Sequence, residues 1–158
     1  MEQDLDASHW IARRDLLGFG AIGAAIGLLS WRAVRPPEPP ITETVSVSEA
    51  LARADAGSIT LIDIRRPDEW AATGIATPAH PLDMRRDDFA ARLAQIATPG
   101  TPVALICARG VRSARMAEEL RAAGFDRIID VPEGMIGSAA GPGWIAEGLP
   151  VKPHEGAD

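Results

Sequence analysis

The alternation of short apolar runs with amphipathic segments limits the fold of this chain more than any other feature. Residues 59–64, 103–106 and 127–131 form runs rich in Val, Ile and Leu. Such runs are typical of strands that are buried on both faces of a sheet. Because these runs alternate with helical segments, the sequence predicts an α/β fold with a central, mostly parallel sheet flanked by helices.

Three segments have the spacing of amphipathic helices, with apolar residues three or four positions apart. They are residues 46–56, 89–96 and 113–123. We expect the side chain of Ser46 or Ser48 to cap the first helix, and that of Asp87 or Asp88 to cap the second. Gly124 is expected to end the third.

Composition excludes several classes of function. The chain has 158 residues, which is enough for one ordinary domain with appendages, and a net charge of -6, which argues against general binding to nucleic acid. Its single cysteine excludes an internal disulfide. No metal site is expected, because His9, His80 and His154 are scattered without the spacing of metal ligands.

An apolar segment near the start of the chain predicts contact with a membrane. Residues 16–31 are uncharged and follow residues 1–15, which contain the pair Arg13-Arg14. As a helix the segment would extend about 24 Å at ~1.5 Å per residue, against ~30 Å for a hydrocarbon core. We expect one N-terminal apolar helix that acts as an uncleaved anchor; the alternatives are a cleaved export signal and a buried helix of a soluble domain.

The pair Arg13-Arg14, with the apolar stretch behind it, resembles the twin-arginine export signal of bacteria. This resemblance implies a domain tethered to the bacterial inner membrane and facing the periplasm, or free in the periplasm after cleavage. Residues 32–43 are rich in proline and predict an extended linker. We place the folded domain at residues 44–151 and a polar tail at residues 152–158.

Cys107 lies where an expected strand meets an expected helix. A free cysteine is most often a small buried apolar residue. Here the N-terminal end of the helix and two arginines, Arg109 and Arg112, would all favour an anion, and therefore the thiolate. Gly110 permits a tight loop. Parallel sheets carry their sites at the carboxyl ends of strands, so a nucleophilic thiolate is expected at this position.

The loop and two distant segments together resemble one known family. Cys107-Ala108-Arg109-Gly110-Val111-Arg112 is similar to the six-residue active-site loop of rhodanese-like sulfurtransferases. Residues 61–70 resemble the first signature of that family, and residues 134–135 and 144–151 resemble its closing motifs. The resemblance covers residues 44–151. Thr73-Gly74-Ile75 departs from the family pattern, and residues 136–143 resemble an insertion.

This resemblance implies a three-layer fold and a sulfurtransferase that needs no metal or organic cofactor. Cys107 would attack the outer sulfur of thiosulfate or a similar anionic donor and form a persulfide, which a thiol, cyanide or a protein acceptor then discharges. Arg112 would orient the loop and hold the donor's anionic group, and Asp63 and Arg65 would brace the site. The residues expected to bind the donor are Ala108, Arg109, Gly110, Val111, Arg112 and Ser113.

Two other interpretations remain open. The first is a membrane-tethered persulfide carrier or interaction module with little thiosulfate turnover. The second is a cysteine phosphatase or arsenate reductase. The related phosphatases have one more residue between cysteine and arginine than the four found between Cys107 and Arg112, so the loop favours sulfur.

Overall fold

The computed structural model describes residues 43–154. The chain divides into two compact units, Met1–Pro40 and Ile41–Asp158, and the fold belongs to the second. The expected apolar helix at residues 16–31, the arginine pair and most of the linker lie outside the described residues, as do residues 155–158 of the expected tail. Within residues 43–154, no helix is long and apolar enough to cross a membrane.

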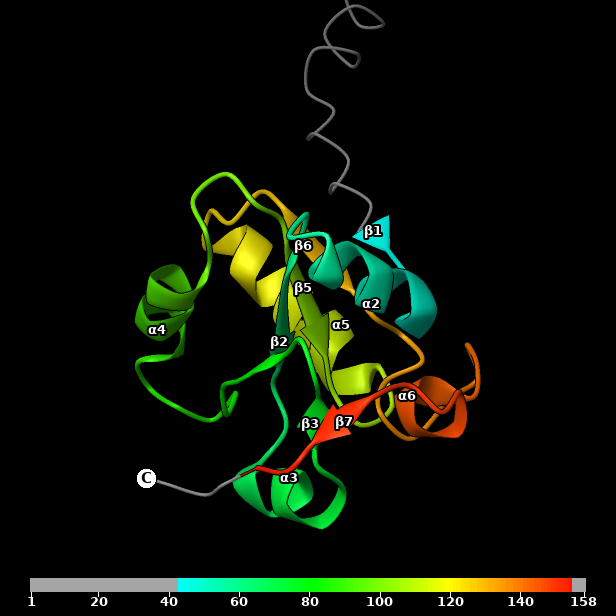
Figure 1. The fold of residues 1–158 in the computed structure, drawn as a ribbon. Helices are drawn as coiled ribbons and strands as arrows, with labels where there is room; N and C mark the ends of the chain where they lie inside the picture. Colours follow the sequence, from blue (N-terminus) through cyan, green and yellow to red (C-terminus); the bar gives the residue numbers. More distant parts are fainter. Residues whose placement is uncertain (1–42, 155–158) are drawn as a thin grey trace, which may run out of the picture. The chain divides into compact units, whose positions relative to one another are not determined.

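A parallel sheet forms the centre of the domain (Figure 1). Its strands follow the order β1-β6-β5-β2-β4, and each pair of neighbours is parallel. The strands are β1 (Glu43–Thr44), β6 (Ile128–Asp130), β5 (Val103–Ile106), β2 (Thr60–Asp63) and β4 (His80–Pro81). A second, two-stranded antiparallel sheet pairs β3 (Ile75–Ala76) with β7 (Val151–Lys152).

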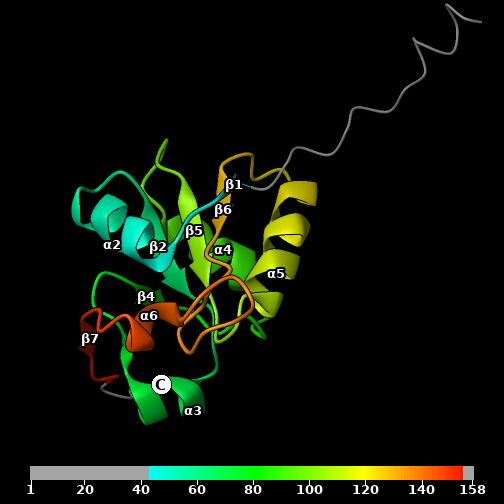
Figure 2. The same ribbon diagram turned by 90° about the vertical axis from the view of Figure 1, so that its right-hand side faces the viewer.

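Helices cover both faces of the parallel sheet. Figure 2 shows α2 and α5 on opposite sides of the strands. The helices are α2 (Val47–Asp55), α3 (Pro67–Thr73), α4 (Phe89–Ile96), α5 (Val111–Ala122) and α6 (Gly143–Ala146). The predicted α/β fold with a mostly parallel sheet flanked by helices is therefore confirmed.

The apolar strands supply two separate clusters because successive side chains of a strand point to opposite faces. In β5, Ala104 and Ile106 belong to the cluster that contains buried residues of α2 and the fully buried Trp144 of α6. Val103, Leu105 and the adjacent Cys107 belong to the cluster that contains residues of α4 and α5. The cysteine therefore lies on the α5 side of the sheet.

The predicted helix ends agree with the structure to within two residues. Ser46 caps α2 as expected, and its Oγ accepts a hydrogen bond from the Glu49 N–H at 3.2 Å. Asp88 occupies the N-cap position of α4 but makes no capping bond. Its carboxylate instead accepts hydrogen bonds from Arg86 and Arg92.

Candidate active site

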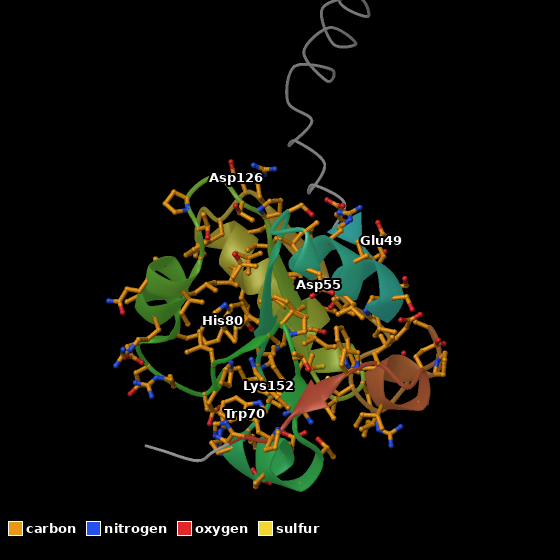
Figure 3. The ribbon with its side chains drawn as sticks, in the orientation of Figure 1. Glu49, Asp55, Trp70, His80, Asp126 and Lys152 are labelled. Atoms are coloured by element: carbon orange, nitrogen blue, oxygen red, sulfur yellow. The ribbon has the colours of Figure 1, made fainter. Side chains whose placement is uncertain are left out.

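The carboxyl ends of the two central strands bring together the main residues expected at the site. Asp63 ends β2 and pairs in register with Ile106 of β5, and Cys107 follows directly. Figure 3 shows Asp126, which precedes β6, at one end of the domain and Trp70, which follows β2, at the other. The cysteine loop lies at the same end of the strands as α3, because α3 also follows a strand's carboxyl end.

The loop from Cys107 to Arg112 is shaped by Gly110. This residue has φ of 81° and occupies the N-cap position of α5. A Cβ atom at Gly110 would collide with the carbonyl group of Pro132. Two independent constraints therefore require glycine at this position: the left-handed backbone conformation and the close approach of another segment. Ser113 Oγ donates a hydrogen bond of 2.9 Å to the Gly110 carbonyl and so ties the loop to the helix.

A second segment, residues 134–136, holds the other end of the loop. The Met135 N–H donates to the Cys107 carbonyl at 2.8 Å, and the Ile136 N–H donates to the Ala108 carbonyl at 3.0 Å. Gly134 has φ of 69°, and a Cβ atom there would lie 2.5 Å from the Ala108 carbonyl oxygen. Residues 134–135 form a motif that is visible in the sequence, but their contact with the cysteine loop is not predictable from that motif.

Arg112 lies between Cys107 and a carboxylate that the sequence analysis did not select. Its two terminal nitrogens donate to the two carboxylate oxygens of Glu69 at 2.7 and 2.6 Å. The Arg112 guanidinium also interacts electrostatically with the Cys107 side chain. The Arg112 guanidinium lowers the pKa of Glu69 to about 2, while Glu69, and to a lesser degree Cys107, raises the pKa of Arg112.

The position of Glu69 follows from the start of α3. Pro67 stands at the beginning of the helix, where its missing N–H costs no helical bond. Glu69 is two residues further on, and its carboxylate accepts a hydrogen bond from the Arg66 N–H at 3.1 Å. A carboxylate near a helix N-terminus is also favoured by the helix dipole. The sequence signal was present in the Glu of the first signature, but its partner across the fold was not predictable from spacing.

Asp63 and Arg65 form an ion pair that is almost fully buried. Arg65 Nη2 donates to Asp63 Oδ2 at 2.7 Å, and the two side chains are 1% and 0% exposed. The other terminal nitrogen of Arg65, Nη1, donates to Thr73 Oγ1 at 2.7 Å. Arg65 Nη2 also donates to the Gly74 carbonyl at 2.7 Å. This pair therefore fixes the end of α3 to β2. An effect on the cysteine loop remains a prediction.

The remaining expected residues differ in exposure. Cys107 is only 1% exposed, so its neighbours cover most of the thiol. Ser113 is buried and Ala108 is half-buried, whereas Arg109 is exposed. Val111 is 78% exposed, although it is a large apolar residue. A donor that approaches the loop from solvent would therefore meet Arg109 and Val111 before it reaches Cys107.

A pocket of about 700 Å³ lies beside this site. Its lining includes Trp70 of α3, Ile96 of α4 and Leu82, which follows β4. No residue of the range 107–112 lines it. Its charged side chains Asp83 and Arg86 are held in ion pairs with Arg85 and Asp88, respectively. These charged groups of the pocket are thus already paired, and the candidate nucleophile Cys107 does not line it. Within residues 43–154, no group of three His, Cys, Asp or Glu residues is arranged to hold a metal ion.

Comparison with protein families gives one match over most of the domain. Residues 46–137 match a family model described as a rhodanese-like domain. This range includes Glu69, the cysteine loop and the supporting segment at residues 134–136. The comparison with curated proteins found no match.

Several solved structures are similar to this chain. The 30 kDa polysulfide-sulfur transferase homodimer from Wolinella succinogenes is 26% identical, with a TM-score of 0.57, and the match covers 85% of this chain and 91% of that chain. A rhodanese-like domain protein from Staphylococcus aureus is 28% identical, with a TM-score of 0.52 and coverage of 70% and 99%. Rv0390 from M. tuberculosis is 26% identical, with a TM-score of 0.56 and coverage of 72% and 98%.

Proposed function

The chain belongs to the rhodanese-like domain family, and from this premise we propose that it is a sulfurtransferase that carries sulfur as a persulfide on Cys107. The observation that carries the proposal is the position of the cysteine. It precedes the N-terminal end of α5 and lies close enough to the Arg112 guanidinium to interact with it electrostatically. A helix N-terminus and a guanidinium both stabilise an anionic sulfur, in the free thiolate and in the persulfide alike.

The reaction is a double displacement. The Cys107 thiolate attacks the outer sulfur of a donor, the S–S bond of the donor breaks, and its electron pair leaves with the remaining group. With thiosulfate, which we propose as a donor, the leaving group is sulfite. A thiol or cyanide then attacks the outer sulfur of the persulfide and regenerates the thiolate. In each step one bond to the transferred sulfur breaks as another forms, and the leaving group takes the electron pair, so neither step needs an external oxidant or reductant.

Loop size supports sulfur over phosphorus as the atom attacked. Four residues separate Cys107 from Arg112, and Gly110 and Gly134 bring the loop against the segment that follows β6. Since Cys107 is 1% exposed, the reacting end of a substrate must be narrow. A terminal sulfur atom fits this requirement better than a tetrahedral phosphoryl or arsenate group. We therefore set aside the phosphatase and arsenate reductase interpretations.

Mass spectrometry of the purified full chain tests the proposal directly. After incubation with thiosulfate, the protein should gain about 32 Da, the mass of one sulfur atom, because the persulfide is a covalent intermediate. Cyanide should remove this gain and yield thiocyanate. Cys107→Ser should show neither effect, since Cys107 is the single cysteine of the chain. Wild-type turnover by Cys107→Ser would exclude the mechanism.

A second candidate function, a persulfide carrier for a protein partner, is favoured by the apolar rim of the loop. Val111 is 78% exposed and Ile136 is 42% exposed, and the Ile136 N–H bonds to the loop carbonyl of Ala108. Exposed apolar groups beside a reactive sulfur suit contact with another protein. Fast transfer from a protein persulfide, combined with weak turnover of thiosulfate, would favour this function over the first.

We also propose that residues 16–31 anchor the protein in the bacterial inner membrane, with the sulfurtransferase domain in the periplasm. This part of the proposal rests on the apolar segment and the arginine pair of the sequence. The segment lies outside the described residues, and its test is given in the Discussion.

A further inference from the structure

We propose that Glu69 sets the charge selectivity of the sulfur-donor site: by neutralising Arg112, it lowers the preference of the site for doubly charged donors. The inference rests on the proposed sulfurtransferase function. It adds a specificity-determining residue on α3, a helix that does not contain the cysteine loop.

The guanidinium of Arg112 is engaged on two sides. Both terminal nitrogens donate to Glu69, at 2.7 and 2.6 Å, in the parallel arrangement that matches a guanidinium to a carboxylate. The same guanidinium also interacts electrostatically with Cys107. A donor such as thiosulfate would need the same fork in order to bind Arg112 through two oxygens. Glu69 therefore occupies the position where an anionic group of the donor would otherwise bind.

Glu69 is held in this position by its own helix. Its carboxylate accepts hydrogen bonds from the Arg66 N–H at 3.1 Å and from Arg66 Nε at 3.2 Å, and the Glu69 side chain is 20% exposed. The far end of α3 is fixed by the contacts of the buried Arg65 with Thr73 and Gly74. The carboxylate is thus a fixed part of the site rather than a mobile counter-ion.

The net charge beside the nucleophile follows from these contacts. Arg112 and Glu69 cancel each other, and the Cys107 thiolate adds a negative charge. Arg109 is exposed at the rim of the loop. A dianion that approaches the sulfur therefore meets less positive charge than the two loop arginines alone would supply. The binding of a monoanion of the same shape is weakened less by the missing positive charge. Its electrostatic interaction with the site is smaller, because that interaction is proportional to the charge of the donor.

A pair of donors that differ by one charge isolates the effect. Thiosulfate is a dianion, whereas methanethiosulfonate is a monoanion in which a methyl group replaces one oxygen. In both cases the Cys107 thiolate attacks the outer sulfur, the S–S bond breaks, and sulfite or methanesulfinate leaves with the electron pair. The ratio of kcat/KM for thiosulfate to kcat/KM for methanethiosulfonate cancels any change in the amount of thiolate, because the same sulfur attacks both donors.

The experiment measures this ratio for the wild-type full chain and for Glu69→Gln, with cyanide as acceptor. The neutral amide should raise the ratio by roughly 3- to 30-fold, the range that Coulomb's law gives for one unit charge at about 6 Å in surroundings more polar than a protein interior. A ratio for Glu69→Gln within twofold of wild type would overturn the inference. Absence of Cys107 persulfide with both donors in wild type would instead overturn the proposed function.

Three further variants separate charge from structure. Glu69→Asp keeps the charge and should keep the wild-type ratio; a rise equal to that of Glu69→Gln would contradict a charge effect. Asp68→Asn removes the same charge from the same helix at a side chain that is 66% exposed and paired with Arg66, so its ratio should stay within twofold of wild type. Arg112→Gln leaves Glu69 unneutralised and should lower the ratio, which keeps the test decisive if Glu69→Gln fails to fold.

Discussion

At the scale of single residues, the two arginines of the cysteine loop have different environments. Arg112 is half-buried, pairs with Glu69 and interacts electrostatically with Cys107, whereas Arg109 is exposed. A half-buried guanidinium held by a carboxylate keeps one orientation and acts on the thiolate at short range. An exposed arginine is screened by solvent and acts mainly by attracting an anion to the rim.

Arg112→Ala should therefore lower kcat/KM with thiosulfate by ~10- to 1,000-fold, the range expected when a charged partner worth roughly 1.5 to 4 kcal/mol is lost. Arg112→Lys should restore only part of the turnover, since lysine cannot make the same fork of hydrogen bonds. Arg109→Ala should chiefly raise KM. Steady-state turnover with thiosulfate and cyanide measures these effects.

Unchanged turnover in a folded Arg112→Ala protein would contradict the role of Arg112. A loss for Arg109→Ala as large as that for Arg112→Ala would show that the rim charge, rather than the buried contact, controls the reaction.

The Glu69–Arg112 pair should also make the stability of the domain depend on pH. The Arg112 guanidinium lowers the pKa of Glu69 from 4.5 to about 2. A carboxyl group with a lowered pKa in the folded state stabilises the fold above its unfolded pKa, and this contribution is lost as pH falls through the folded value. Glu69→Gln should therefore lower the free energy of unfolding by about 1 to 3 kcal/mol at pH 7.

Most of this difference between wild type and Glu69→Gln should disappear between pH 5 and pH 2, as the wild-type carboxyl group becomes protonated. Denaturant unfolding at pH 7 and at the lowest pH where both proteins remain folded measures it. A difference that grows as the pH falls would have the wrong sign for this ion pair.

At the scale of secondary-structure elements, the cysteine loop depends on Gly110, which another segment approaches closely. Gly110 and Gly100 have nearly equal φ angles, 81° and 80°, so an alanine at either position carries a similar backbone cost. Only the Cβ at Gly110 meets another segment, at Pro132, whereas the space beside Gly100 is open within 4 Å. The two positions thus separate backbone strain from the contact that shapes the loop.

Gly100→Ala should cost about 1 to 2 kcal/mol of unfolding free energy, the cost of a left-handed conformation for a residue with a Cβ atom. Gly110→Ala should cost about 1 to 3 kcal/mol more, because backbone atoms must move apart, and should lower kcat/KM at least ~10-fold. Thermal or denaturant unfolding and turnover with thiosulfate test both variants. Equal effects of the two variants on turnover would show that the contact with Pro132 does not matter to the reaction.

Among the secondary-structure elements, sequence patterns predict some and miss others. Sequence patterns predicted the strands at residues 103–106 and 127–131, because short apolar runs between turns indicate strands that are buried on both faces. They also predicted the helix that follows Cys107, because its apolar residues recur at helical spacing. The two-residue strand β4 was not predicted, since His80–Pro81 is too short to show a period. The sequence placed Cys107 and Arg112 in one loop, but contacts such as Glu69 with Arg112 join residues 43 positions apart and depend on how α3 packs.

At the scale of the whole molecule, the rhodanese-like domain and the preceding segment belong to separate units of the chain. A thiolate that exchanges sulfur with small anions does not by itself require a membrane. The apolar residues 16–31 and the proline-rich linker would instead determine the compartment in which donors and acceptors are met. Location is therefore a property to be tested apart from catalysis.

We expect the domain to be exported by the twin-arginine route and to face the periplasm. Wild-type protein in bacterial spheroplasts should be digested by added protease, and replacement of both Arg13 and Arg14 by Lys should leave the domain protected inside the cell, because that route reads the arginine pair. A substrate of the general secretory route, carrying the same exchange, should still be exported. Digestion of the double mutant would exclude dependence on the arginine pair, whereas protection of the wild-type domain would exclude the periplasmic location while leaving the cysteine chemistry intact.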